Sequence, residues 1–217
     1  MTLQLRVYVP PHPLIKHWLG VARDAATPSV LFRSAMTELG RWLTYEAARD
    51  WLPTEDTMVQ TPLGTCPATL INPEVPVAVV PILRAGLALL EGAQTLLPLA
   101  SIYHLGLMRD EKTLLPISYL NKLPERFNPQ TRVLIPEPML ATGGTIMTAM
   151  AELQKRGVDP ALTRIISVVA APPALQKLSA CYPGLIIYTA TIDEAVNSQG
   201  FILPGLGDAG DRAFGTN

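Results

Sequence analysis

The chain has 217 residues, of which 48% are hydrophobic and 16% are charged, and its formal net charge is −1. This length and apolar content suffice for one α/β domain over residues 1–217, and the near-neutral charge gives no general attraction to nucleic acid or to an anionic membrane. Since no signal peptide, long apolar span or lipidation motif is found, we expect a cytoplasmic protein. Cys66 and Cys181 lack CxxC spacing and are expected to be reduced, packed thiols.

Helical spacing dominates the start of the chain. After an extended segment over 3–9, apolar residues at helical intervals predict a short helix over 13–22 and a longer one that runs to about Asp50. Thr27 and Pro28 are residue types that N-cap and first-turn positions favour, so we expect the second helix to begin there. These helices carry no catalytic pattern, and packing or assembly is their expected role.

A hairpin pattern follows the second helix. The segments 57–60 and 67–70 flank Pro62-Leu63-Gly64, whose residue types favour a turn. We therefore predict a β-hairpin arm over 57–70. Because no chemistry-bearing pattern lies in it, this arm is expected to serve packing or assembly.

The rest of the chain alternates strand and helix patterns, which predicts a mostly parallel sheet with helices on both faces. Strands are expected at 75–83, 100–107, 117–120, 132–135, 164–170 and 185–190, and helices at 87–97, 144–156 and 172–181. The first strand, VPVAVVPIL, is continuously apolar, which is typical of a strand buried on both faces. Ligands of such sheets bind beyond the carboxyl ends of the strands. Arg84, Arg109 and Glu137 each follow a predicted strand, so we expect them to converge there.

The segment 133–146, VLIPEPMLATGGTI, has the pattern of an anion-binding loop between a strand and a helix. Glycines let backbone N–H groups approach an anion, and the helix N-terminus adds a partial positive charge. The sequence therefore predicts that residues 142–145 hold the phosphate of a sugar phosphate and that Glu137 accepts hydrogen bonds from the sugar. The alternatives are an ordinary glycine turn before a capped helix and, for Glu137, an exposed charge at a strand end.

Two further patterns come from arginine and glycine. The guanidinium group of Arg84 suits diphosphate oxygens, and the following Ala85-Gly86 lets backbone come close, with a surface position as the alternative. The segment 205–210 satisfies GxGxxG. A dinucleotide site needs a helix and a further strand after this motif, and only seven residues remain, so we reject that interpretation.

Six segments together resemble the uracil phosphoribosyltransferase family. They are VPILRAGLALLEG (80–92), GLMRDEKTL (106–114), PMLATGGT (138–145), VAAPPAL (169–175), YTATID (188–193) and GFILPGLGDAGDRAFGT (200–216). The resemblance implies an α/β protein of the type I phosphoribosyltransferase fold, with a mostly parallel central sheet flanked by helices, the β-arm and a small uracil-binding region over 188–217. It implies transfer of the phosphoribosyl group of phosphoribosyl diphosphate (PRPP) to N1 of uracil, giving UMP and diphosphate.

The resemblance also implies roles for individual residues. Those expected to be catalytic are Arg84, Arg109 and Asp208. Those expected to bind PRPP are Arg84, Arg109, Glu137, Pro138, Met139, Leu140, Ala141, Thr142, Gly143, Gly144, Thr145 and Asp208. Those expected to bind uracil, largely through backbone groups, are Ile202, Gly207, Asp208 and Ala209. From the residues alone, Arg109 has a surface ion pair with Asp110 or Glu111 as its alternative. For Asp208, the alternative is a simple Asx turn without a role in binding.

Cofactor and partners follow from the same resemblance. Mg²⁺ is expected to accompany the diphosphate, held mainly through PRPP near Asp208 and not by direct protein ligands. The expected partners are PRPP, uracil, GTP as an effector and further copies of the chain in a homodimer or larger homo-oligomer. A strained peptide bond, with a cis bond as one form of it, is implied in the loop at Arg84.

The chain departs from the family pattern at the ribose contact. Pro136-Glu137-Pro138-Met139 stands where the family has Val-Asp-Pro-Met. Glu137 is one methylene longer than aspartate, and Pro136 removes a backbone donor at the end of the strand. This departure motivates an alternative function, a catalytically weak regulatory protein that senses PRPP or a nucleotide on the same fold.

Overall fold

The structure is a computed structural model and describes residues 4–109 and 116–216. Its helices are α1 (Pro13–Arg23), α2 (Ser29–Ala48), α3 (Leu87–Leu96), α4 (Gly144–Lys155), the short 3-10 helix η1 (Pro160–Leu162), α5 (Pro172–Cys181) and α6 (Ala209–Phe214). Its strands are β1 (Arg6–Tyr8), β2 (Thr54–Gln60), β3 (Thr65–Ile71), β4 (Val77–Val79), β5 (Ile82–Leu83), β6 (Ser101–Ile102), β7 (Leu105–Arg109), β8 (Pro116–Asn121), β9 (Arg132–Pro136), β10 (Met139–Leu140), β11 (Thr163–Ala170), β12 (Ile186–Ile192), β13 (Ala195–Val196) and β14 (Ile202–Leu203). Within this part of the chain, no helix is both long enough and apolar enough to cross a bilayer.

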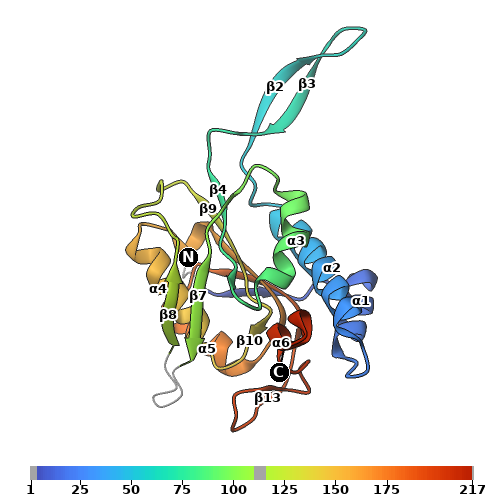
Figure 1. The fold of residues 1–217 in the computed structure, drawn as a ribbon. Helices are drawn as coiled ribbons and strands as arrows, with labels where there is room; N and C mark the ends of the chain where they lie inside the picture. The colour runs from blue at the N-terminus through green and yellow to red at the C-terminus, as the bar shows by residue number, and fades with distance from the viewer. Residues whose placement is uncertain (1–3, 110–115, 217) are drawn as a thin grey trace.

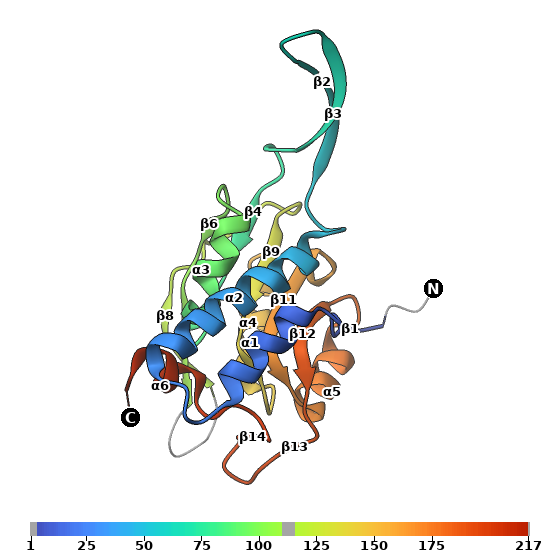
Figure 2. The ribbon, with the colours of Figure 1, turned by 90° about the vertical axis from the view of Figure 1, so that its right-hand side faces the viewer.

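The central sheet has the strand order β1-β12-β11-β9-β4-β6, with β10 paired to β11. Every pairing in it is parallel. Helices α1, α2 and α3 cover one face, and α4 and α5 cover the other (Figure 1; Figure 2). The prediction of a mostly parallel sheet between helices is therefore confirmed.

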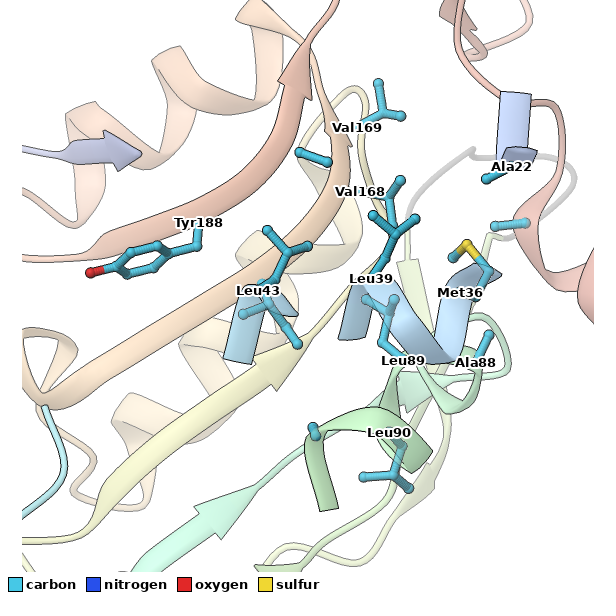
Figure 3. Close-up of a cluster of buried hydrophobic side chains, with 14 of the residues drawn as sticks. Ala22, Met36, Leu39, Leu43, Ala88, Leu89, Leu90, Val168, Val169 and Tyr188 are labelled. Carbon is cyan, nitrogen blue, oxygen red and sulfur yellow. The ribbon is translucent and has the colours of Figure 1, made fainter. Parts of the chain in front are cut away.

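Apolar side chains fill both spaces between the sheet and the helices. Along β9, Leu134 packs toward α2 while Val133 and Ile135 pack toward α4, because successive side chains of a strand point to opposite faces. Leu39 and Leu43 of α2 lie in the first of these cores with side chains from β11, β12 and α3 (Figure 3). Burying one such side chain contributes roughly 1.5–3 kcal/mol to folding, so the helix layers hold the strand ends in fixed positions.

Two predicted strands are each split between two sheets. The segment 75–83 forms β4 in the central sheet and β5 in a separate β5-β7-β8 sheet, so its prediction as one strand is wrong. Pro81 lies at the break and has no N–H with which to continue the ladder. The segment 100–107 is likewise split into β6 and β7, because β6 pairs with β4 and β7 pairs with β5. Together, β5 and β7 carry the chain away from the central sheet at its carboxyl edge.

Two local predictions about the helical layer are also wrong. Pro28, not Thr27, is the N-cap of α2, and it makes no side-chain capping bond. The Thr27 hydroxyl instead donates to the carbonyl of Val21 at 2.8 Å, which ties the loop back to α1. Both cysteines are free, as expected, but Cys181 is exposed at the end of α5 and not packed.

The hairpin arm is present and extends away from the body of the molecule (Figure 1; Figure 2). Strands β2 and β3 pair in antiparallel register from Thr54 with Ile71 to Gln60 with Thr65. At the turn, the Thr61 hydroxyl accepts the N–H of Gly64 at 3.1 Å. The predicted hairpin is therefore confirmed. Strand β2 begins three residues before the expected start at 57, and β3 ends one residue after the expected end at 70.

Candidate active site

A cavity of about 270 Å³ lies at the carboxyl edge of the central sheet. Its lining residues come from the segment that follows β9 through β10 into the first turn of α4, and from the C-terminal segment. They are Glu137, Met139, Leu140, Ala141, Thr142, Gly143, Gly144, Thr145, Ile146, Gln199, Gly200, Phe201, Ile202 and Asp208. The cavity thus joins the predicted phosphate and sugar residues to two predicted base-binding residues, Ile202 and Asp208. Pro138 stands just behind this wall, where its carbonyl accepts the N–H of Val168 at 2.9 Å.

The phosphate loop, residues 142–145, has the geometry of an anion cradle. Gly143 is the N-cap of α4 with φ of 84°, and no side chain caps this helix. Within the described residues, the N–H groups of Gly143, Gly144 and Thr145 donate to no protein acceptor, and the hydroxyls of Thr142 and Thr145 have no partner. The alternative of an ordinary helix capped by a side chain is therefore wrong for α4. The open amides and the helix N-terminus favour an anion.

Gly143 cannot be replaced without strain, because L side chains rarely adopt its left-handed conformation. A Cβ at this position would also lie 3.1 Å from the Cα of Ala174 in α5. The backbone of the loop at Gly143 therefore packs directly against α5.

Glu137 lies at the end of β9 and is buried, with 8% of its surface exposed. Its backbone N–H donates to the carbonyl of Ile166 at 3.0 Å, which fixes the strand end. Burial raises the pKa of Glu137 to about 8, and a hydrogen bond from the Met139 amide opposes this shift only in part. The alternative of an exposed charge is therefore wrong. Burial therefore favours the protonated, neutral form of the Glu137 carboxyl group.

Arg84 follows β5 after a cis peptide bond between Leu83 and Arg84, a form of bond that the family resemblance implied. Its guanidinium donates to the Asp211 carboxylate at 2.9 Å and is half exposed. Arg84 does not line the cavity and instead faces α6. Its loop is nevertheless fixed to the site, because a Cβ at Gly86 would lie 2.5 Å from the carbonyl oxygen of Pro136.

The second predicted arginine, Arg109, is the last residue of β7. Strand β7 runs parallel to β5, with Leu105 opposite Ile82. The chain therefore leaves β5 and β7 on the same side of this small sheet. The side chain of Arg109 and its proposed ion-pair partners, Asp110 and Glu111, lie outside the described residues.

Asp208 has two structural roles in the C-terminal segment. It is the N-cap of α6, where its carboxylate accepts the N–H of Asp211 at 2.9 Å, and it also lines the cavity. Asp208 therefore forms the simple Asx-type cap and also lies on the cavity wall. Gly207 is exposed beside Asp208, and Ala209 is the buried first residue of α6.

Sequence reasoning missed four lining residues, Ile146 in the first turn of α4 and Gln199, Gly200 and Phe201 in the C-terminal segment. It also missed the contacts that anchor the C-terminal segment. The carboxylate of Asp193 accepts the N–H of Gly205 at 2.8 Å and pairs with Arg23 of α1. A turn signal precedes Phe201, since Asn197 accepts the Phe201 N–H at 2.9 Å. That local signal could have identified the turn. The long-range contact with Arg23 left no signal in the sequence.

The oxygen donors of the cavity suit a magnesium ion that arrives with a phosphate ligand. Among residues 4–109 and 116–216, no three His, Cys, Asp or Glu side chains form a group that could hold a metal. Glu137 and Asp208 are the carboxyl groups on the cavity wall, and Asp208 is the exposed one. Mg²⁺ is commonly bound by one or two carboxylates together with substrate phosphates and water, so this donor set fits the ion.

Comparisons with known proteins agree with the site. The sequence model of the uracil phosphoribosyltransferase family matches residues 9–216. A protein of that name from Nostoc sp. is 82% identical over 216 residues, covering all of both chains. One from Synechocystis sp. is 68% identical, again over all of both chains. The solved structure of the AQ2163 protein from Aquifex aeolicus has a TM-score of 0.85 and 38% identity, over 96% of this chain and 97% of that one.

These matches span the central sheet, the phosphate loop and the C-terminal segment together. The predicted type I phosphoribosyltransferase fold is confirmed, with its mainly parallel sheet flanked by helices. Because the family match begins before α1 and ends after α6, it covers every residue that lines the cavity. The chain belongs to the uracil phosphoribosyltransferase family.

Proposed function

We propose that this chain transfers the phosphoribosyl group of PRPP to N1 of uracil, giving UMP and diphosphate. Its full-length membership of the uracil phosphoribosyltransferase family carries this proposal. The cavity supports it, because it joins an anion-binding loop to an acid and to a C-terminal segment that can form a base pocket. No comparison supports the alternative of a regulatory PRPP or nucleotide sensor.

The 5-phosphate and the ribose are assigned to neighbouring parts of the cavity. The amides of the phosphate loop and the hydroxyls of Thr142 and Thr145 donate to the phosphate. The Glu137 carboxyl group faces the ribose hydroxyls and accepts two hydrogen bonds when it is ionised. Contacts along residues 137–145 therefore orient C1 of the ribose toward the base.

The diphosphate is assigned to Arg84, Arg109 and Asp208. Breaking the bond from C1 to the diphosphate builds negative charge on the leaving group and positive charge on the ribose. The two guanidinium groups stabilise the departing charge, and Arg84 must exchange or share its Asp211 partner to do so. When bound, Mg²⁺ would neutralise further charge on the diphosphate, and the Asp208 carboxylate would help to hold it.

Uracil is assigned to the C-terminal segment over 188–217. Backbone groups at Ile202, Gly207 and Ala209 would meet the O4 and N3–H edge of the base. Cytosine presents the opposite donor and acceptor pattern, and a site built for one edge can reject such a mismatch by roughly 10⁴–10⁵ because buried partners stay unpaired. Holding N1 of uracil over C1 of the ribose supplies the proximity that the reaction needs.

We further propose that residues 1–217 act as one domain in a homodimer or larger homo-oligomer. The arm is the expected contact element, since its Met58, Leu63 and Leu70 are exposed and the arm extends away from the body of the protomer (Figure 1). A cytoplasmic location is also proposed, and control by GTP is proposed from the family resemblance. Sedimentation with and without GTP would test the assembly and the effector together.

The reaction is tested by incubating the purified chain with PRPP, Mg²⁺ and labelled uracil or labelled cytosine. Labelled UMP is expected from uracil, and no labelled product from cytosine. If PRPP binds but UMP does not form, the enzymatic assignment is wrong and the sensing alternative gains its first support.

A further inference from the structure

A lysine from α5 contacts the phosphate loop from outside the cavity. The Lys177 ammonium group donates to the backbone carbonyl of Thr142 at 2.7 Å. Lys177 does not line the cavity, whereas Thr142 and Gly143 do. The lysine is therefore behind the loop, on the side where α5 packs against α4. The two residues are 35 positions apart, so the contact depends on the fold.

This contact fixes the orientation of one peptide unit. The Thr142 carbonyl and the Gly143 N–H belong to the same peptide, which is not among the cis bonds of the described chain. In a trans peptide the C=O and the N–H point in opposite directions. Since the carbonyl points back to Lys177, the Gly143 N–H points away from Lys177. That N–H has no acceptor among the described residues, and Gly143 is one of the residues that line the cavity.

Without such a lock, glycine leaves this peptide free to turn over. Gly143 tolerates conformations that other residues do not, so rotation of the Thr142–Gly143 peptide has a low steric cost on its glycine side. The turned-over peptide would present a carbonyl oxygen to the bound anion in place of a donor. The Lys177 alkyl chain also lies along the loop, with its Cδ 3.4 Å from where a Gly143 Cβ would stand.

We propose that Lys177 is a positioning residue for the 5-phosphate site, acting through the Thr142 carbonyl to keep the Gly143 N–H directed at the phosphate. The inference rests on the proposed function only through the assignment of the loop to phosphate. Lys177 itself does not touch the ligand. A charged donor makes one of the stronger hydrogen bonds in proteins, so its loss should be measurable in phosphate affinity.

The test compares three variants by calorimetry with ribose 5-phosphate, a probe that needs no turnover. Lys177→Met removes the donor and the charge, and Lys177→Arg keeps both. Lys155→Met is the matched control, because Lys155 on α4 is exposed, pairs with Glu152 at 3.2 Å and does not line the cavity. Lys177→Met is expected to weaken binding about tenfold, as loss of a charged hydrogen bond would. The KM for PRPP should rise in parallel, while the KM for uracil and the melting temperature stay unchanged.

Further measurements separate positioning from simple charge. Lys177→Arg should bind ribose 5-phosphate nearly as well as the unaltered chain, and the Lys177→Met defect should persist at high ionic strength, where distant charges are screened. A defect that vanishes in high salt, or one matched by Lys155→Met, would overturn the proposal. If Lys177→Met and the unaltered chain bind the probe equally well, the proposed role of Lys177 is wrong, but the assignment of the loop to phosphate stands. Failure of the unaltered chain to bind the probe would overturn the phosphate assignment as well.

Discussion

The phosphate loop and the strand end at Glu137 share one cavity, but they are prepared for a ligand in different ways. The loop presents backbone amides whose directions are set by Gly143, by the start of α4 and by packing on α5. Glu137 presents a single carboxyl group whose charge depends on its surroundings, and burial raises its pKa to about 8. Both parts are held by the same sheet edge.

This contrast teaches that the two halves of the site should respond to different perturbations. Amide donors do not titrate, so the loop should be sensitive to backbone geometry and insensitive to the protonation of the protein. The acid should be sensitive to pH and tolerant of small changes in backbone position.

The largest effect is expected in the pH dependence of stability. Between the unfolded pKa of 4.5 and the folded pKa of about 8, folded Glu137 keeps a proton that the unfolded chain has lost. The free energy of unfolding should therefore fall as pH rises, by about 1.4 kcal/mol per pH unit or roughly 3 kcal/mol over two units. Glu137→Gln cannot titrate and should lack this slope. Urea unfolding of both chains at several pH values between these limits measures it, and equal slopes would mean that Glu137 is ionised in the fold.

Gly143→Ala should damage the loop half of the site. The left-handed conformation costs an L residue about 1–2 kcal/mol, and the added Cβ would lie 3.1 Å from the Cα of Ala174. We expect kcat/KM for PRPP to fall about 50-fold, equivalent to roughly 2.3 kcal/mol, at every pH. Gly20→Ala is the control, since a Cβ there has no neighbour within 4 Å. Normal kinetics for Gly143→Ala would show that the loop is less fixed than its geometry indicates.

Arg84→Ala tests the contacts to the diphosphate leaving group separately from the contacts that the phosphate loop and Glu137 make. Because Arg84 faces α6 and is assigned to the diphosphate, its loss should raise the KM for PRPP about tenfold, the effect of one charged contact. UMP has no diphosphate, so its affinity should be unchanged. Arg49→Ala, on the far end of α2, serves as the control. An equal loss of UMP and PRPP binding would show that Arg84 supports the fold of the site and not the diphosphate.

The smallest effect is expected for Glu137→Asp. The variant removes one methylene and restores the acid that the family pattern has at this position. We expect the Kd for PRPP to be preserved or improved, with a change below about threefold, or roughly 0.6 kcal/mol. Fluorescence or calorimetric titration with PRPP measures it. A large loss of affinity would mean that the β9 end is built around the longer acid.

Much of the fold and the phosphate loop could be predicted because their signals are local. Helix α5 has the predicted bounds, since Pro172 opens it and its apolar spacing continues to Cys181. The loop of small and hydroxyl residues after β9 was recognisable from glycine and helix-start chemistry alone. The split of the segment 75–83 was harder to predict, because continuous apolar character does not say with which sheet each half will pair. Pro81 marks the break only when the pairing of β4 and β5 is known.

By itself, the sequence determined the alternation of strands and helices, the hairpin, the phosphate loop and the family. Only the tertiary structure decided that Glu137 is buried, that Arg84 pairs with Asp211, that residues 199–201 complete the cavity and that Lys177 contacts Thr142 from behind. The physical reason is that periodicity and turn chemistry depend on neighbours along the chain. Burial, proton affinity and side-chain partners depend on elements that only the folded layers bring together.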